Sequence, residues 1–552
     1  MKLFFLFILI CFGSSYFIGG SPFPWTSSSQ DLLWFLGLIL FFILFYKKQL
    51  NIPKITFPIV FICLIPLIQF IFGQIYYFST ALFSFCFMLG FLVSILYGYN
   101  CTQVAEKNNI ITCVAYFFII IGFISAIFAI AQWFQISHPY ILNLNHNRPY
   151  ANLGQPNHLA TLLMLSICSI FFIYEHCNYK WIYCITLLSF DILALALTQS
   201  RTSWVILILL LMTYFLKKIS FKKKSTSYMV YFTFFSYILI FIFNSEISKY
   251  LNLVAPIPMG DRLNGGFARV EMWRHMLYAI MQHPWFGYGW FQTTIAQLEG
   301  VLIFKNEGYL SSAHNIIIDL VLWVGIPLGL LISLYCLYLI KLIYFNIKTL
   351  SELYIFMMIL CMVVHAHLEY PLYYSYFLFP LGFFIGMSLI NCNSKDYFVH
   401  EKLKQIIFLI SICFYALVFK QYDQWLSKLG FALGMENTGQ SQYKKSILFS
   451  QFADQAEFIV AEIDKSYTQD ELGFFEYYVV SQPSYYNLFK MAQIFYFNKN
   501  MVKANYYFEV SNMLYNKKTS FEDLSKLNIS QNNNISLLFS KYNNDTSNLK
   551  AK

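Results

Sequence analysis

His314 is the residue whose type and place in the sequence best suit proton transfer. It stands in the segment SSAHN, directly before a long apolar stretch, and an imidazole accepts a proton at neutral pH. A positioned general base typically accelerates a reaction by about 10²–10⁴-fold. Asp319 follows five residues later, which is not quite the same helix face, so it is either a partner of His314 or a buried structural acid. A structural role for His314 fits the pattern equally well.

The arginines form a second set of candidates. The chain has thirty-two lysines and only five arginines, namely Arg148, Arg201, Arg262, Arg269 and Arg274. A guanidinium presents a planar fork of donors that matches phosphate oxygens and stays charged at any working pH. The group therefore indicates an anionic ligand, most simply a phosphate or pyrophosphate. The alternatives are a membrane-interface anchor for Arg201, which separates two apolar stretches, and a solvated loop face for Arg269 and Arg274.

The sequence NLGQPNHLA, residues 152–160, combines a turn with polar side chains at the start of an apolar stretch. The Gly-Gln-Pro-Asn part is typical of a turn, and Asn157 is the expected N-cap of the following helix. Gln155, Asn157 and His158 are then expected to point donors and acceptors at the membrane surface. These three residues are candidates for positioning a substrate.

A third polar group, in HAHLEYP, ends another apolar stretch. His365, His367 and Glu369 invite a zinc hypothesis, but alternate residues converge only in an extended segment, and neither an HExxH motif nor a Cys/His set supports it. We therefore predict no metal and no cofactor. A polar hinge that positions the substrate or His314 is the favoured interpretation.

Composition shows what must hold these residues in place. Hydrophobic residues make up 58% of the chain and charged residues 12%, whereas soluble domains carry about 25% charged residues. Apolar stretches near 20 residues are the length that a membrane-spanning helix needs. An all-α polytopic membrane protein with about thirteen spans is predicted. The expected spans are 3–19, 31–46, 55–73, 78–98, 110–135, 157–175, 181–198, 202–217, 228–246, 314–342, 351–366, 372–391 and 404–420.

The lysines predict the orientation of these spans. They follow the even-numbered spans or precede the odd-numbered ones, so their loops fall on one side, which the positive-inside rule makes cytoplasmic. The net charge of +10 is thereby explained without a nucleic-acid partner. The arginines and the polar motifs fall on the opposite face. The first apolar stretch lacks a clear cleavage site, so an uncleaved span is favoured over a signal peptide.

Three regions follow from the change in composition along the chain. Residues 1–420 form the predicted transmembrane domain, including a loop at 247–313 on the non-cytoplasmic face. Residues 421–526 are polar and are expected to form a small soluble helical domain, in which 484–516 resembles one tetratricopeptide helix pair. Residues 527–552 are rich in Asn and Ser and are expected to be disordered.

The motifs resemble those of the bacterial O-oligosaccharyltransferases of the PglL type, which are protein glycosylation ligases of the O-antigen ligase superfamily. The most specific motif is NLGQPNHLA, and hydropathy extends the resemblance over about residues 1–420. The other motifs that carry it are QSRTSW (199–204), ARVEMW (268–273), HPWFGYGW (283–290), AHNIIIDLVLWVGIPLG (313–329) and HAHLEYPLYY (365–374).

The resemblance implies a GT-C-like fold in the bacterial inner membrane, with the active face and the C-terminal domain in the periplasm. It implies metal-independent, en bloc transfer of an oligosaccharide from undecaprenyl pyrophosphate to Ser or Thr of a pilin or another periplasmic protein. By motif, His314 corresponds to the essential histidine of the family, and Arg201 and Arg269 to arginines that face the pyrophosphate.

Two alternatives remain at this stage. An O-antigen ligase or polymerase would use the same donor chemistry with a different acceptor. A transporter or flippase of lipid-linked glycans would carry the same apolar helices. Transporters usually show intramembrane charges or repeated halves, and no internal repeat is obvious here.

Overall fold

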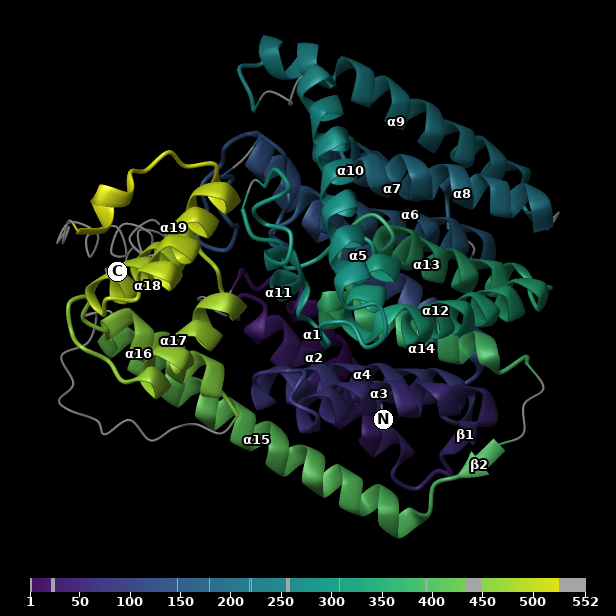
Figure 1. Cartoon of the computed structure of the whole chain (residues 1–552). Coiled ribbons are helices and arrows are strands. Elements are labelled where there is room, and N and C mark those ends of the chain that lie inside the picture. The colour runs from purple at the N-terminus through teal and green to yellow at the C-terminus, as the bar shows by residue number, and fades with distance from the viewer. Residues whose placement is uncertain are drawn as a thin grey trace. The chain divides into compact units, whose positions relative to one another are not determined.

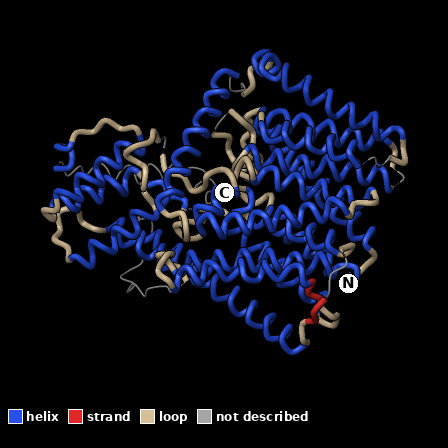
Figure 2. The backbone as a smooth tube through the Cα atoms, turned by 45° about the vertical axis from the view of Figure 1, so that its right-hand side comes forward, coloured by secondary structure: helices blue, strands red, loops and turns tan. Residues whose placement is uncertain are grey.

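The computed structural model describes most of the chain, and most of the described residues are in helices (Figures 1 and 2). The described residues are 2–20, 25–145, 147–177, 179–217, 219, 221–254, 259–306, 308–392, 396–432 and 448–525. The disorder predicted for 527–552 falls outside them. The described strands are β1 (Asn51–Pro53) and β2 (Asp396–Phe398), which pair in antiparallel fashion.

Every predicted span coincides with a helix. Among the described residues, nine helical stretches are long and apolar enough to cross a membrane, while α13 and α14 are shorter apolar helices, and α1 and α8 have 13 and 17 residues. The all-α polytopic fold class is confirmed. The helices are α1 (Lys2–Ser14), α2 (Ser28–Phe41), α3 (Phe57–Ile71), α4 (Phe78–Asn100), α5 (Lys107–Trp133), α6 (Pro156–His176), α7 (Trp181–Thr198), α8 (Arg201–Lys217), α9 (Lys224–Tyr250), α12 (Ile316–Phe345), α13 (Leu350–Ala366), α14 (Ser375–Leu389) and α15 (Glu401–Ala432).

The region predicted as a long loop, 247–313, is more helical than its glycines suggest. It contains α10 (Met259–Gln282) and the short α11 (Thr293–Leu298). Gly265 and Gly266 lie inside α10. Each glycine weakens a helix by only about 1 kcal/mol relative to alanine, and favourable contacts of neighbouring residues can offset such a cost.

The chain divides into two compact units. The first comprises Met1–Ile62, Phe87–Leu263 and Leu334–Tyr415, and the second comprises Cys63–Cys86, Asn264–Ser333 and Ala416–Lys552. Each is described separately below. The division into a 1–420 transmembrane domain and a 421–526 soluble domain stays a prediction.

In the first unit, the helix ends that carry lysines lie together. Lys107 at the start of α5 is 3.9 Å from Glu352 near the start of α13, and Lys404 near the start of α15 donates to the carbonyl of Lys48 at 2.6 Å. Further contacts at this end join Lys217 to Tyr344, Lys223 to Tyr174 and Tyr99 to Asp396. We call this the lysine end of the unit.

The other ends of the same helices carry the polar motifs, and we call them the site end. Asn152 Nδ2 donates to the carbonyl of Phe17 after α1, and Asp31 in the first turn of α2 accepts from Ser375 N at 3.1 Å at the start of α14. Trp133 at the end of α5 bonds Ser248 of α9 at 3.1 Å. Lys249, next to Ser248, is an exception to the separation of lysines from this end.

Helix α6 lies at the centre of the first unit, because 89% of the residues in its most apolar 18-residue stretch are buried. It packs against α5, α7, α8 and α13. Gly122 of α5 allows a close approach, because a Cβ there would lie 2.4 Å from the Cβ of Ser166 in α6. The polar motif that opens α6 therefore starts from a rigid element.

In the second unit, α12 is broken at Gly325, which has φ 81° and ψ 169°, two residues before Pro327. Pro327 has no N–H to donate to the carbonyl of Trp323, so the pattern of helical hydrogen bonds is interrupted here. Residues 284–290 supply hydrogen-bond partners for the backbone groups left unpaired by the break. The bonds are Tyr288 N to Leu322 O at 2.7 Å, Gly289 N to Trp323 O at 3.0 Å and Ile326 N to Pro284 O at 2.7 Å. Gln69 Nε2 also donates to Trp323 O at 2.8 Å.

The second unit also contains the C-terminal helices α16 (Ser450–Val460), α17 (Gln469–Ser481), α18 (Tyr485–Phe497) and α19 (Met501–Tyr515). The helix pair predicted within 484–516 is confirmed as α18 and α19, which share one apolar core with α17. Lys490 of α18 is buried and donates to the carbonyls of Phe458 and Ile459 at 2.8 Å each. Burial lowers the pKa of Lys490 to about 8. This ammonium thereby caps the end of α16.

Gly325→Ala is expected to lower the free energy of unfolding by at least about 2 kcal/mol, because this backbone conformation is essentially restricted to glycine. A Cβ there would also lie 2.2 Å from the carbonyl oxygen of Trp285. Thermal unfolding of the purified protein in detergent measures the effect. The control is Gly473→Ala in α17, where the space is open and alanine should be neutral or stabilising. Equal melting temperatures for both variants would contradict the importance of the break.

Candidate active site

Asn157 joins four segments at the site end of the first unit. Its Nδ2 donates to Glu369 Oε1 at 2.8 Å, and its Oδ1 accepts from Ser200 Oγ at 2.8 Å and from Arg148 Nη2 at 3.2 Å. Arg148 Nε also donates to the carbonyl of Thr198 at 2.8 Å. The amide therefore ties the loop before α6, the start of α6, the α7–α8 turn and the segment after α13 to one another.

Gln155, and not Asn157, is the N-cap residue of α6. The predicted cap is wrong because Pro156 takes the first helical position, which suits its fixed φ and its missing N–H. The side chain of Asn157 is thereby left to the contacts described above. Gln155 Nε2 donates to the hydroxyl of Tyr370 at 2.5 Å, so it too binds the segment after α13.

His158 is fully buried, so the expectation that it points at the membrane surface is wrong. Its Nδ1 lies 2.9 Å from the hydroxyl of Tyr376, and its ring centroid lies 4.8 Å from that of Tyr374 and 5.4 Å from those of Phe377 and His365. Within the described part of the chain, its Nε2 has no hydrogen-bond partner. His158 thus fixes the start of α14 against α6.

The residues of the HAHLEYP motif turn to different partners. His365 is buried with its Nδ1 2.8 Å from Thr161 Oγ1, while His367 Nδ1 lies 2.8 Å from the carbonyl of Val363. Glu369 is 6% exposed and binds Asn157, as described above. Over the residues that the structure describes, no group of three or more ligand-type side chains is arranged to hold a metal ion.

Arg201 is the first residue of α8 and is exposed at the site end. The turn before it is fixed, because Gln199 adopts a left-handed conformation with φ 50°, Ser200 binds Asn157, and Ser203 Oγ donates to the carbonyl of Ser200 at 2.7 Å. The N-terminus of a helix carries partial positive charge and unpaired N–H groups. A guanidinium at this position suits an anionic ligand.

In the second unit, a buried carboxylate shapes the turn that carries His314. Asp319 is 1% exposed, and its oxygens accept from Ser312 Oγ at 2.6 Å and from Ala313 N and Thr293 Oγ1 at 2.9 Å each. Ser312 Oγ in turn accepts from His314 N at 2.9 Å, and His314 has a left-handed φ of 52°. Of the two interpretations of Asp319, these contacts favour the buried acid, which holds the backbone of His314 in an unusual conformation.

Arg269 lies on the face of α10 that meets this turn. Trp273, four residues later, donates from Nε1 to the carbonyl of Ala313 at 2.9 Å. Residues four apart share a helix face, so Arg269 and His314 belong to neighbouring parts of the second unit. Arg274 instead forms an exposed ion pair with Glu271 at 3.1 Å.

The candidate residues therefore fall into two groups. The first unit holds Gln155, Asn157, His158, Arg201, His365, His367 and Glu369, and the second unit holds Arg269 and His314. Three residues that contact candidates, namely Ser200, Tyr370 and Tyr376, were not expected from the sequence, whereas Arg148 was among the arginines expected to meet an anionic ligand. The scarcity of arginine was a usable signal for Arg148. For Tyr370 and Tyr376 the sequence gives only a cluster of tyrosines as a signal. Their contacts could not be predicted, because their partners are more than 200 residues away in the chain.

Asn157→Asp is expected to lower the free energy of unfolding by about 1–3 kcal/mol, because it removes the donor to Glu369 and places two carboxylates in contact. Thermal unfolding of the purified protein in detergent measures the effect. Asn145→Asp, in the exposed part of the same loop, is the matched control and should stay within about 0.5 kcal/mol of the parent protein. Equal unfolding temperatures for the two variants would show that Asn157 does not hold the four segments together.

Comparison with protein families places this architecture in a class. A family model described as O-Antigen ligase matches residues 184–333, one described as Protein glycosylation ligase matches 149–169, and one described as Virulence factor membrane-bound polymerase, C-terminal, matches 353–526. This multi-pass helical chain is thus similar to the O-antigen ligase class over three segments. The matched segments include the NLGQPNHLA motif, Arg201, Arg269 and His314.

Two curated relatives define the family more closely. A general O-oligosaccharyltransferase of Acinetobacter baylyi is 30% identical over 527 residues, which cover 92% of each chain. A ComP-specific O-oligosaccharyltransferase of the same organism is 33% identical over 406 residues, which cover 72% of this chain and 73% of the relative. The chain belongs to the O-oligosaccharyltransferase family, the glycosyltransferases of O-linked protein glycosylation, which use a lipid-linked oligosaccharide and a protein acceptor. Membership in a family of enzymes argues against the transporter alternative.

Proposed function

We propose that this chain transfers an oligosaccharide en bloc from undecaprenyl pyrophosphate to a Ser or Thr hydroxyl of a pilin or another periplasmic protein. The observation that carries the proposal is the separation of charge in the first unit. Arg148 and Arg201 lie at the site end, whereas lysines cluster at the opposite end. The positive-inside rule then puts the arginines in the leaflet where a translocated lipid pyrophosphate is exposed.

The proposed reaction is a substitution at the anomeric carbon of the glycan. The acceptor oxygen forms a bond to that carbon, the bond to the pyrophosphate oxygen breaks, and the lipid pyrophosphate leaves with the electron pair. His314 takes the proton of the acceptor hydroxyl. Arg201 and Arg269 stabilise the charge that develops on the leaving group, because fixed donors need no reorganisation during the reaction. No metal or other cofactor enters this scheme.

The remaining candidates have supporting roles in this proposal. Three of them, Gln155, Asn157 and Glu369, join the start of α6 to the segment after α13. Asn157 also binds Arg148, so these contacts hold the region of Arg148 and Arg201 in place. His158, His365 and His367 fix the ends of α6, α13 and α14. All six position the substrate site through the backbone that they hold. The proposed location is the bacterial inner membrane, with the site end and residues 421–526 in the periplasm.

Mass spectrometry of periplasmic proteins and pilin tests this function. Cells with and without the gene are compared, and the lipid-linked glycan is measured in both. The expected result of deletion is loss of Ser- and Thr-linked glycan together with accumulation of the lipid-linked donor. Unchanged glycoproteins in the deletion strain would refute the proposal. A single modified pilin, as opposed to many modified proteins, would identify a dedicated ligase.

A second candidate function is supported by two of the family matches. Models described as an O-antigen ligase and as a membrane-bound polymerase match residues 184–333 and 353–526. Either activity would use the same donor with a glycan or lipid acceptor. Loss of lipopolysaccharide ladders in the deletion strain, with protein glycosylation intact, would favour this candidate over protein transfer.

A further inference from the structure

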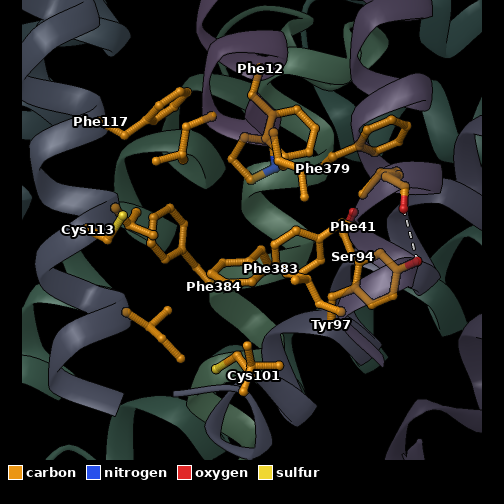
Figure 3. A pocket seen from close by; sticks show the side chains of 18 of the residues that line it. Phe12, Phe41, Ser94, Tyr97, Cys101, Cys113, Phe117, Phe379, Phe383 and Phe384 are labelled. Carbon is orange, nitrogen blue, oxygen red and sulfur yellow. Dashed lines mark hydrogen bonds between the residues drawn. The ribbon is translucent and has the colours of Figure 1, made fainter. Parts of the chain in front are cut away.

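The first unit contains an apolar cavity that the transfer reaction does not use. Its volume is about 250 Å³, and it lies among α1, α2, α4, α5 and α14. Figure 3 shows the rings of Phe12, Phe117, Phe379, Phe383 and Phe384 around it. Helices α2, α4 and α5 lie in stretches long and apolar enough to cross a membrane, and α14 is a shorter apolar helix, so we expect hydrocarbon around the cavity.

The few polar atoms in its lining do not favour water. Ser94 Oγ donates to the carbonyl of Gly90 at 2.8 Å, and Tyr97 OH donates to the carbonyl of Leu38 at 3.0 Å. Trp34 Nε1 has no hydrogen-bond partner among the described residues, but a buried water needs two to four polar partners. An engineered apolar cavity of about 150 Å³ stays dry and admits benzene. A larger cavity in lipid should therefore hold part of a hydrocarbon chain.

The mouth of the cavity lies at the lysine end. Ala105 and Asn109, which line it, are exposed beside the start of α5, and Lys107 stands between them. Leu44, another lining residue, precedes the exposed Lys47 and Lys48 by a few residues. Hydrogen bonds between Asn100 and Asn51 hold the segments after α2 and α4 together. The entrance thus has Lys47, Lys48 and Lys107 within a few residues of it in the sequence. The exposed Glu106 is also there, and Lys107 lies 3.9 Å from Glu352, so the lysines leave a net positive charge.

We propose that this cavity binds one acyl chain of an anionic phospholipid, whose phosphate headgroup meets Lys47, Lys48 and Lys107. Charge at the mouth and hydrocarbon inside match the two parts of such a lipid. The donor lipid is not the expected occupant, because its pyrophosphate belongs at the site end, where α5 finishes. The bound chain fills the space between α1 and α5. The proposal goes beyond glycan transfer and does not depend on it.

Native mass spectrometry of the full chain, purified in mild detergent, tests the occupant. The parent protein should retain an anionic phospholipid, identified by fragmentation, and Cys113→Phe should retain at least tenfold less, since Cys113 lines the cavity. In vesicles, exchange of Lys47, Lys48 and Lys107 for glutamine should weaken retention of phosphatidylglycerol relative to phosphatidylcholine. Lys180→Gln, at the exposed start of α7, is the matched control and should leave retention unchanged.

A second measurement does not depend on the fold of the cavity-filling variant. The intact protein is placed in vesicles of phosphatidylglycerol with brominated acyl chains, which quench nearby tryptophan fluorescence. Part of the quenching should disappear in Trp34→Phe, because Trp34 lines the cavity. A retained polyprenyl lipid, retention of phosphatidylglycerol equal to that of phosphatidylcholine, or quenching that is unchanged by Trp34→Phe would overturn the proposal.

Discussion

Exchange of His314 for alanine should reduce oligosaccharide transfer by about 10²–10⁴-fold, because a general base typically contributes that much. Protein level and the pool of lipid-linked donor should stay unchanged, since the turn that carries His314 is held by Asp319 and Ser312 and not by the imidazole alone. The measurement is the fraction of acceptor protein modified in a deletion strain that expresses each variant. Normal glycoprotein in the His314→Ala strain would remove this residue from the mechanism.

Two further variants separate proton transfer from a damaged turn. His138→Ala, in an exposed loop, is the matched control and should transfer like the parent protein. Asp319→Asn keeps an acceptor oxygen for Ala313 N and Thr293 Oγ1 but loses the one for Ser312 Oγ. We expect it to lower the rate of transfer while leaving its dependence on pH unchanged, because the base itself remains. An altered pH profile would instead place Asp319 in the proton pathway.

Replacement of Arg201 by lysine should reduce transfer by about 10–100-fold although the charge is kept. Lysine loses the planar fork, and a hydrogen bond to a charged group contributes about 1.5–3 kcal/mol. Initial rates at several donor concentrations measure the effect. If Arg201 binds the pyrophosphate in both the bound donor and the transition state, KM should rise. If it binds only the leaving group, kcat should fall.

Arg274→Lys is the matched control for this experiment. Arg274 lies 67% exposed in an ion pair with Glu271, and exposed pairs contribute little, about 0–1 kcal/mol. Transfer should therefore remain within a few-fold of the parent protein. Equal losses for Arg201→Lys and Arg274→Lys would show that general basicity, and not a specific guanidinium site, supports the reaction.

The membrane helices were predictable because lipid imposes a strong local constraint. A backbone in hydrocarbon must form its hydrogen bonds within a helix of about 20 apolar residues. Each span can therefore be recognised from the hydropathy of its own stretch of sequence. The break in α12 was not predicted. Gly325 and Pro327 are visible in the sequence, but the partner segment that satisfies the exposed carbonyls lies near Pro284, and only folding brings it there.

The chemical types of the candidate residues were also predictable, whereas their orientations were not. Arginine matches phosphate and histidine carries protons wherever they stand, so Arg201 and His314 could be named from residue type and place. Whether a side chain faces a ligand or its neighbours depends on distant contacts. His158 turned out buried against Tyr376, and Asn157 turned out to bridge Glu369, Ser200 and Arg148.

The sequence by itself thus determined the apolar helices, the class of membrane protein and the scarce arginines, because each depends on local composition or residue chemistry. Tertiary structure decided which polar residues hold one another. Asp319 lies five residues from His314 in the sequence, yet it acts on the backbone of His314 through Ser312 and Ala313, and it also accepts from Thr293 of α11. The physical reason is that a buried carboxylate must be satisfied by whatever donors the fold supplies, and those donors come from several segments.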